Sequence, residues 1–343
     1  MRPVDKLTEA ELLSATSPEA IFTDDADTMK REWRALVKIW HPDQNPKANR
    51  DVMTHVNKLY DVGCEKLKLG IWFNPYALRI KATNGKEYDL KFKKHRTFEL
   101  GDVYIGVKQV SYLLDKSPAA AALVENMKQT VASFKFKDAK MEEHARKFLP
   151  KILASVETAD KLVVVLAKEP DMILLRDVIE HKGGKLDPVQ AAWIITRFYN
   201  VGSYLDIMKL THNDLSPDSM FVSPDHKSLV TGWWYATPRG QKMRYASSRT
   251  VLYSPIDVTT YKDANHRIDG ELIKATGREL FGDPAGSALN FDPKIPRPLK
   301  EWATSPSSDN IVEEFKKWQE TILNSFGKRR YVELDAKFSD IYP

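Results

Sequence analysis

The sequence has 343 residues, of which 42% are hydrophobic and 29% charged, an ordinary composition for a folded protein of about two domains. The net charge of +5 is mild and no dense basic block is present, so we do not expect nucleic acid to be a ligand. The single cysteine Cys64 allows no intramolecular disulfide, residues 1–13 have no apolar core of the signal-peptide kind, and no apolar run is long enough for a membrane span. The cytoplasm is therefore the expected location, with no membrane partner.

The first 70 residues have the pattern of a small helical domain. Thr8 or Ser14 can cap a short helix that starts near Thr8. Apolar residues spaced by three and four predict a second helix over about 27–40, namely Trp33, Leu36, Val37 and Trp40. Pro42 ends that helix, and the pattern resumes over about 48–67. The pattern changes near 69–75, so we predict a first domain at 1–70 and a linker at 71–84.

The segment from Met29 to Gly63 resembles the J-domain family, in which an antiparallel helix pair carries a His-Pro-Asp tripeptide in the connecting loop. The matching residues are His41, Pro42, Asp43, Asn45, Pro46, Asn57 and Tyr60. Gln44 departs from the family, which usually has lysine there. The first helix matches weakly, and a longer insert at 17–27 precedes the second.

This resemblance implies recognition of a protein partner. The resemblance, together with a basic stripe on the second helix, gives the expected chaperone-binding set: Lys30, Arg31, Arg34, Lys38, His41, Pro42 and Asp43. Three of the cations lie four residues apart, so they share one helical face that can approach an acidic surface. In the family, Asp43 would pair with an arginine of a DnaK-type chaperone ATPase, which the protein would recruit and stimulate. The alternative is that the tripeptide forms an ordinary turn and that the basic face of the helix is only solvated, without a partner.

Residues beyond the linker predict strands first and helices afterwards. Alternating residues predict strands at 88–92, 103–105 and 110–113, and an apolar run predicts another at 162–166. Helices are expected at about 117–131 and 139–155, and again beyond Pro188, with a loop-rich stretch at about 222–266. This order favours a small β-rich lobe joined to a larger α-rich lobe.

The same region resembles the protein-kinase-like fold over about 85–335, most strongly at 160–236. Residues 167–170 stand at the hinge, and 195–210 form the long helix before the catalytic loop. Residues 211–222 align with the family's HRDLKPENILL loop, and Asp269 stands where a buried helix aspartate anchors that loop. The resemblance implies an α+β chain, in which an all-α J-domain hairpin is followed by a bilobal kinase-like domain at 85–343. Its small lobe is expected at about 85–167 and its large lobe at about 168–343.

The kinase loop lacks parts that phosphoryl transfer needs, and its vestigial residues are His212, Asp214, Ser219 and Gly232. Asp214 stands at the base position, but Ser219 replaces the magnesium-binding asparagine and Gly232 the metal-binding aspartate of DFG. Ser216 stands at the loop-lysine position, and the family's glycine-rich loop is absent. The strand lysine has only weak candidates, Lys135 or Lys137, with Glu142 or Glu143 as the helix partner. We therefore expect a pseudokinase with no confident catalytic residue, no metal site and no cofactor.

Together these features predict a co-chaperone-like adaptor for a DnaK-type chaperone, with the kinase-like domain as a platform for an unknown protein client. Two rivals stay open. One is an unusual kinase or phosphotransferase that uses Asp214 with rearranged metal ligands. The other is an assembly protein that uses the J-domain only for docking. Such a fusion would suit a protein encoded by a bacterium or by a virus, and a viral protein of this kind would act in the host cytoplasm.

Overall fold

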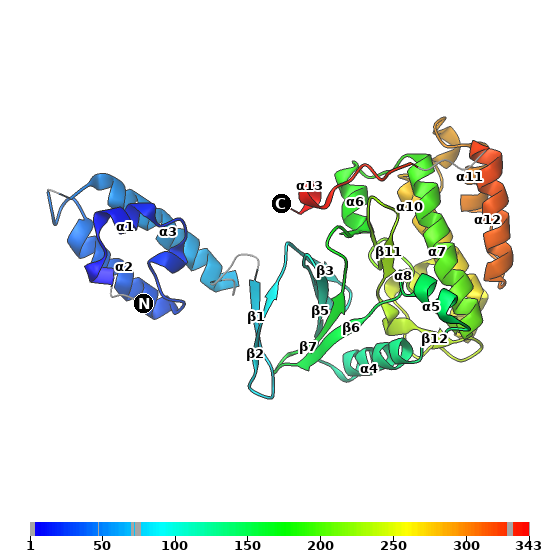
Figure 1. Cartoon of the computed structure of the whole chain (residues 1–343), viewed down its shortest axis with the longest axis horizontal. Helices are drawn as coiled ribbons and strands as arrows, with labels where there is room; N and C mark the ends of the chain where they lie inside the picture. Colours follow the sequence, from blue (N-terminus) through cyan, green and yellow to red (C-terminus); the bar gives the residue numbers. More distant parts are fainter. Residues whose placement is uncertain (1–3, 47, 70–71, 73–76, 328–331, 343) are drawn as a thin grey trace. The chain divides into compact units, whose positions relative to one another are not determined.

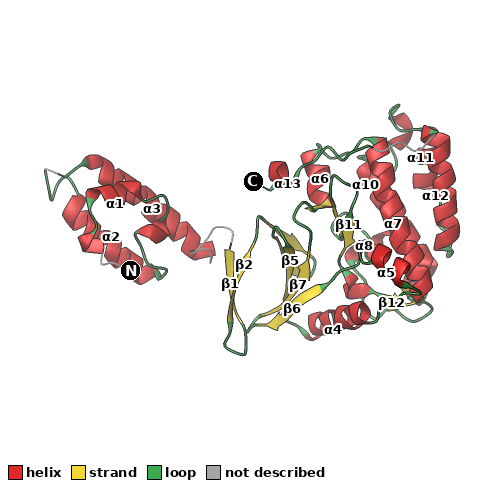
Figure 2. Cartoon of the chain, in the orientation of Figure 1, coloured by secondary structure: helices red, strands yellow, loops and turns green. Residues whose placement is uncertain are grey.

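The computed structural model describes residues 4–46, 48–69, 72, 77–327 and 332–342. The chain divides into two compact units, Met1–Phe92 and Lys93–Pro343 (Figure 1), and each is described by itself. The first unit consists of helices and one hairpin. The second unit combines a sheet with a helical part, so the α+β pattern expected from the sequence is present (Figure 2).

The helices of the first unit begin and end close to the predicted positions. Helix α1 (Glu9–Ser14) begins at Thr8, which forms a capping box with Glu11. Helix α2 (Ala26–Trp40) is capped by Asp25, whose carboxylate accepts a hydrogen bond from the Thr28 N–H. Helix α3 (Arg50–Leu69) follows the loop that contains the His-Pro-Asp tripeptide. Short 3-10 helices at Val4–Lys6 and Pro18–Ala20 complete this part of the unit.

Helices α2 and α3 pack through a small apolar core. Its most deeply buried side chains, at 0–1% exposure, are Leu12, Ile21, Phe22, Met29, Leu36, Val52 and Val56. Trp33 stacks on Tyr60 with ring centroids 4.9 Å apart, and its indole N–H donates to Asn57 Oδ1 at 2.9 Å. A Cβ at Gly63 would lie 2.9 Å from Met29 Sδ, so any larger residue here would require the Met29 side chain to move.

A two-stranded hairpin follows, which corrects the predicted linker. Strand β1 (Ala77–Lys81) pairs antiparallel with β2 (Glu87–Lys91). Part of the expected linker at 71–84 lies outside the described residues, namely 71 and 73–76, but 77–84 form β1 and the turn. The second unit begins at Lys93, so the expected start at 85 is also eight residues too early. Only one of the five β1 residues is fully buried, which explains why its alternation was missed.

The second unit begins with a five-stranded antiparallel sheet in the order β3-β4-β5-β7-β6. Its strands are β3 (Lys94–Phe98), β4 (Gly101–Ile105), β5 (Gln109–Asp115), β6 (Ile152–Glu157) and β7 (Lys161–Ala167). Helix α4 (Pro118–Ala132) packs against the sheet, followed by the short α5 (Ala139–Ala145). The helix predicted at 139–155 is therefore wrong beyond Ala145, because Pro150 interrupts it and 152–157 join the sheet as an edge strand.

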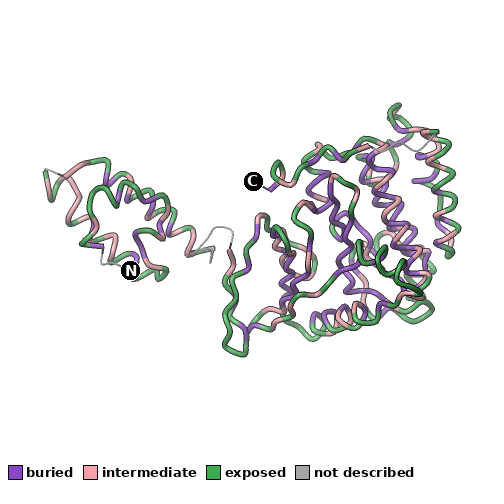
Figure 3. The backbone as a smooth tube through the Cα atoms, in the orientation of Figure 1, coloured by how far each residue is buried: buried purple, intermediate pink, exposed green. Residues whose placement is uncertain are grey.

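A helical part follows the sheet and is built around α7 (Pro188–Met208). Helices α10 (His266–Leu280) and α12 (Ile311–Phe326) pack against α7. Helix α11 (Arg297–Thr304) packs against α10 and α12. Most of α7 is buried (Figure 3), including Phe198 and Tyr199 at 0% exposure. The shorter elements are α6 (Leu175–His181), α8 (Ser248–Tyr253), α9 (Ile256–Tyr261), α13 (Phe338–Ile341), and the strands β8 (Ile173–Leu174), β9 (Leu210–Thr211), β10 (Met220–Val222), β11 (Ser228–Val230) and β12 (Thr237–Pro238).

Candidate functional site

The loop between β9 and β10 carries the vestigial residues His212, Asp214 and Ser219, whereas Gly232 follows β11; hydrogen bonds to α10 hold the loop in place. Asp269 of α10 is fully buried and accepts hydrogen bonds from the N–H groups of His212 (3.1 Å) and Asn213 (2.9 Å). Asn213 has a positive φ of 63°, and its side chain donates to the Tyr235 carbonyl at 2.8 Å. Asp269 therefore anchors the loop in the way the kinase resemblance implied.

His212 is a structural residue of this loop. Its ring is fully buried, its Nε2 lies 2.9 Å from the Thr231 carbonyl, and it meets the Trp233 ring edge to face at 4.7 Å. Burial lowers the pKa of His212 to about 4, although the Asp269 carboxylate opposes the shift. The imidazole is therefore neutral at pH 7, with Nε2 donating its proton to the carbonyl.

Asp214 faces a cleft of about 280 Å³. Other residues that line this cleft include Arg96, Tyr112, Ser216, Ser219, Gly232, Trp234 and Arg249. Burial raises the pKa of Asp214 to about 7, while a hydrogen bond of 2.7 Å from Ser247 Oγ and the charge of Arg249 act in the opposite direction. A carboxyl group with this pKa can exchange a proton near neutral pH, which is the property that a general base needs.

The two positions that hold magnesium in a kinase offer no usable ligand. The Ser219 hydroxyl donates to the Ser216 carbonyl at 3.1 Å and accepts from the Ser216 N–H at 2.9 Å, so it is engaged within the loop. Gly232 has a φ of +77°, and a Cβ there would lie 3.7 Å from Asp214 Oδ2. A side chain at position 232 would therefore lie close to Asp214, but glycine supplies no carboxylate there. Across the described residues no cluster of three or more His, Cys, Asp or Glu side chains could hold a metal ion.

Buried aromatic side chains lie in and next to the cleft. Trp233 is fully buried in the core, and its indole N–H donates to the Val230 carbonyl at 3.0 Å. Trp234 is also buried, but it borders the cleft and meets Tyr112 edge to face at 5.4 Å. The Tyr112 hydroxyl lies 2.8 Å from Thr231 Oγ1. Tyr112 thus lies on the inward side of β5, the strand before helix α4.

The weak candidates for the strand lysine of a kinase and for its glutamate partner lie outside the cleft. Lys135 and Lys137 follow α4 in an irregular segment and do not line the cleft. Glu142 and Glu143 lie on α5, where they pair with Arg146 (3.0 Å) and Lys147 (3.3 Å). The prediction was wrong because residues 134–137 alternate like a strand in sequence, but they form the short connection between α4 and α5 and pair with no strand.

Hydrogen bonds and ion pairs hold the cleft closed. Arg96 of β3 forms ion pairs with Asp177 and Glu180 of α6, the latter with distances of 2.5 and 2.8 Å. Glu99, in the β3–β4 turn, accepts hydrogen bonds from Ser248 N (3.0 Å) and Ser248 Oγ (2.9 Å) at the start of α8. The cleft is consequently smaller than the ligand pockets of about 300–1,000 Å³ typical of small-molecule sites.

Sequence reasoning missed these cleft residues. Arg96 and Ser247 lie in segments without a recognised motif, and they reach Asp214 only through the fold. The inward position of Tyr112 could have been predicted from the sequence, because a strand was expected at 110–113 and alternate residues of a strand face the same side.

The predicted chaperone-binding residues of the first unit lie on α2 and in the loop after it. All four basic side chains of α2 are exposed, namely Lys30, Arg31, Arg34 and Lys38. The Asp43 side chain is 83% exposed, and the Asp43 N–H donates to His41 Nδ1 at 3.2 Å. Asn45 Nδ2 donates to the Ile39 carbonyl at 3.2 Å, which ties the loop to the last turn of α2. The helix that carries the four basic residues therefore ends directly at the tripeptide, with His41 as its C-cap.

Comparison with known proteins identifies a fold. No protein-family model and no curated protein matches the sequence. Among solved structures, vaccinia related kinase 3 aligns over 73% of this chain and 91% of its own length, with a TM-score of 0.52 and 12% sequence identity. None of the helices in the described parts of the chain combines the length and apolar character that a membrane span needs. At such low identity the likeness concerns the fold alone, and we conclude that the chain contains a protein-kinase-like fold.

Proposed function

We propose that the protein is a co-chaperone-like adaptor whose first unit is a J-domain that recruits and stimulates a DnaK-type chaperone ATPase. The observation that carries this proposal is the His41-Pro42-Asp43 loop between two packed helices, in which His41 and Pro42 are half-buried and Asp43 is exposed. Its neighbour α2 presents four exposed cations, which would steer the unit toward an acidic surface. Because Asp43 is 83% exposed, its carboxylate is free to pair with an arginine of the ATPase.

The decisive experiment replaces Asp43 with asparagine and measures the ATPase rate of the cognate chaperone. The wild-type protein should raise the rate, and Asp43→Asn should abolish the increase while the circular dichroism spectrum stays unchanged. Asp61→Asn is a matched control, because Asp61 is an exposed carboxylate of α3 outside the loop. Equal stimulation by the wild type and Asp43→Asn would refute the mechanism. A chaperone that binds without any stimulation would favour the assembly-protein alternative.

The kinase-like unit is proposed as a platform for a protein partner, without catalytic activity. The missing ligands at Ser219 and Gly232 leave the charge of a nucleotide–magnesium complex without its usual protein partners. Large apolar side chains exposed on α8 and α9 support a binding role, namely Val251 (55%), Leu252 (72%), Ile256 (86%) and Tyr261 (65%).

A phosphotransferase remains the second candidate, favoured by one observation. The pKa of Asp214 is raised to about 7, so this residue can accept a proton from a hydroxyl group at neutral pH. Base assistance alone supplies about 10²–10⁴-fold acceleration, far less than phosphoryl transfer needs. Transfer of radiolabelled phosphate that is lost in Asp214→Ala would establish this candidate and reject the platform.

A further inference from the structure

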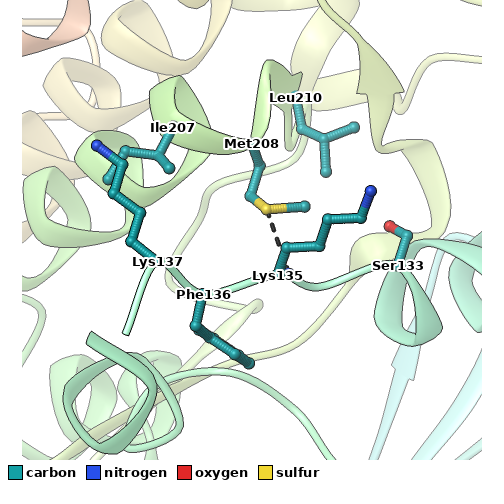
Figure 4. A pocket seen from close by; sticks show the side chains of 7 residues that line it. All are labelled: Ser133, Lys135, Phe136, Lys137, Ile207, Met208 and Leu210. Carbon is teal, nitrogen blue, oxygen red and sulfur yellow. Dashed lines mark hydrogen bonds between the residues drawn. The ribbon is translucent and has the colours of Figure 1, made fainter. Parts of the chain in front are cut away.

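We propose that the kinase-like unit binds an extended acidic segment of a partner protein in a groove beside the end of α7. The groove has a volume of about 550 Å³ and is lined by Ser133, Lys135, Phe136, Lys137, Ile207, Met208 and Leu210 (Figure 4). It is separate from the cleft at Asp214, and none of its lining residues lines that cleft. The inference rests on the proposed platform role, for which it names the chemistry of the partner.

The segment at 134–137, which forms one wall, is held by contacts with α7 and Arg146. Phe134 and Phe136 both turn toward Tyr204 of α7, with ring centroids 5.9 and 6.0 Å away. The Tyr204 hydroxyl donates to the Lys135 carbonyl at 3.3 Å, and Arg146 lies 4.8 Å from the centre of the Phe136 ring. Because residues alternate in an extended chain, fixing the two phenylalanines inward places the two lysines outward.

The outward side carries positive charge that the chain does not neutralise. Lys135 and Lys137 are exposed, and within the described ranges neither has an ion-pair partner. Figure 4 shows their side chains on either side of Met208, while Phe136 points away. The nearest carboxylate along the chain, Asp138, is engaged in capping α5 through the Met141 N–H at 2.7 Å. Two ammonium groups with an apolar floor between them therefore face solvent.

The backbone of this wall offers further donors. The N–H of Lys135 points at Met208 Sδ (3.4 Å), and that of Lys137 at Met141 Sδ (3.3 Å). A thioether is a weak acceptor, so a carbonyl or carboxylate oxygen from a ligand would replace it with a gain in hydrogen-bond strength. The methionine side chains are flexible enough to move aside.

These features together specify the occupant. An extended segment with acidic, apolar and acidic residues at alternate positions places all three side chains on one face. The two carboxylates would then meet the lysines, and the apolar side chain would lie on Met208 and on Ile207, which is 42% exposed. A carbonyl of the same segment would accept from the Lys135 N–H in place of Met208 Sδ.

The test uses a dye-labelled synthetic peptide with glutamate, leucine and glutamate at alternate positions, and fluorescence anisotropy with the full chain. A peptide with glutamine in place of glutamate is the comparator. We expect the acidic peptide to bind, and the double variant Lys135→Glu, Lys137→Glu to weaken binding about tenfold or more at low salt. Ile207→Ser should weaken binding without changing its salt dependence. Lys140→Glu is the matched control, because Lys140 is an exposed lysine of α5 outside the groove.

The outcomes separate this inference from the proposed function. Equal binding of the glutamine peptide would refute the proposal that this groove binds an acidic segment. Undiminished binding by the double lysine variant would refute it as well. Because a charge reversal can disturb folding, Lys135→Gln with Lys137→Gln is measured as well and should weaken binding by a smaller factor. Stimulation of the chaperone ATPase is recorded for the same variants and should stay at the wild-type level. If the peptide binds but the protein does not stimulate the chaperone ATPase, the proposed binding groove is supported and the proposed co-chaperone role is rejected.

Discussion

Replacing Asp214 with asparagine should remove a pH dependence from the stability of the kinase-like unit. Burial raises the pKa of this carboxyl from 3.8 to about 7 in the folded protein. Between these two values the folded state keeps a proton that the unfolded chain has released. The free energy of unfolding therefore falls as the pH rises from about 4 to about 7, and the destabilisation is complete above about pH 7.

The size of the effect follows from the shift. Three pKa units correspond to about 4 kcal/mol, at 1.36 kcal/mol for each unit. Asp214 lies at the wall of a cleft that water can enter, so the effective dielectric constant is higher than in a dry core and about 2 kcal/mol is a better expectation. Asparagine keeps a carbonyl oxygen that can accept the Ser247 hydroxyl, so the hydrogen bond of 2.7 Å should survive.

The assay is urea denaturation of the full chain, followed by tryptophan fluorescence at a series of pH values from about 4.5 to 8. Trp233 and Trp234 are buried near the site and report on this unit. Asp214→Asn should be more stable than the wild type at pH 8 by about 2 kcal/mol, with the difference disappearing toward pH 4.5. Asp309→Asn is the control, since Asp309 is an exposed carboxylate of the same unit outside the cleft. Parallel pH curves for the wild type and Asp214→Asn would refute the claim that this carboxyl is held neutral by burial.

Three further outcomes are expected. Reversing the charge of Lys30, Arg34 and Lys38 should weaken chaperone binding, more so at low salt, because screening acts over about 8–10 Å at ordinary ionic strength; binding that ignores the triple reversal would show the face to be merely solvated. ATP with magnesium should leave the thermal midpoint unchanged and transfer no label, whereas a magnesium-dependent stabilisation would contradict the pseudokinase interpretation. Gly232→Ala should destabilise the unit by about 1–2 kcal/mol in urea titrations, because its φ is +77° and the new Cβ would lie 3.2 Å from Ser219 Cβ; unchanged stability would refute that strain.

The helices and the inner strands could be predicted because their signals are local. Helix α2 shows its apolar face in Trp33 and Leu36 and its end in Pro42, and the apolar run at 162–166 lies within β7. Strand β3 was missed, since its sequence KHRTF has no apolar alternation to detect. It belongs to the sheet through its pairing with β4, and Arg96 is stabilised by acids of α6 more than 80 residues away.

The site was predictable in part for the same reason. The residues of the loop at 212–219 stand in a contiguous motif, so their alignment with a kinase needs no knowledge of the fold. Ser247 and Arg249 have no such context, and they reach Asp214 because Thr250 Oγ1 donates to the Asn213 carbonyl and so brings the start of α8 onto the loop. The groove beside α7 likewise depends on where Tyr204 holds the segment at 134–137.

The contact between Glu99 and Ser248 bears on regulation by phosphorylation. In active kinases a phosphate on the segment before this region orders it by pairing with arginine. A phosphate on Ser248 would instead bring about −1.5 to −2 charges against the Glu99 carboxylate and remove the hydroxyl that donates to it. Phosphorylation here would therefore separate the β3–β4 turn from α8 and widen the cleft.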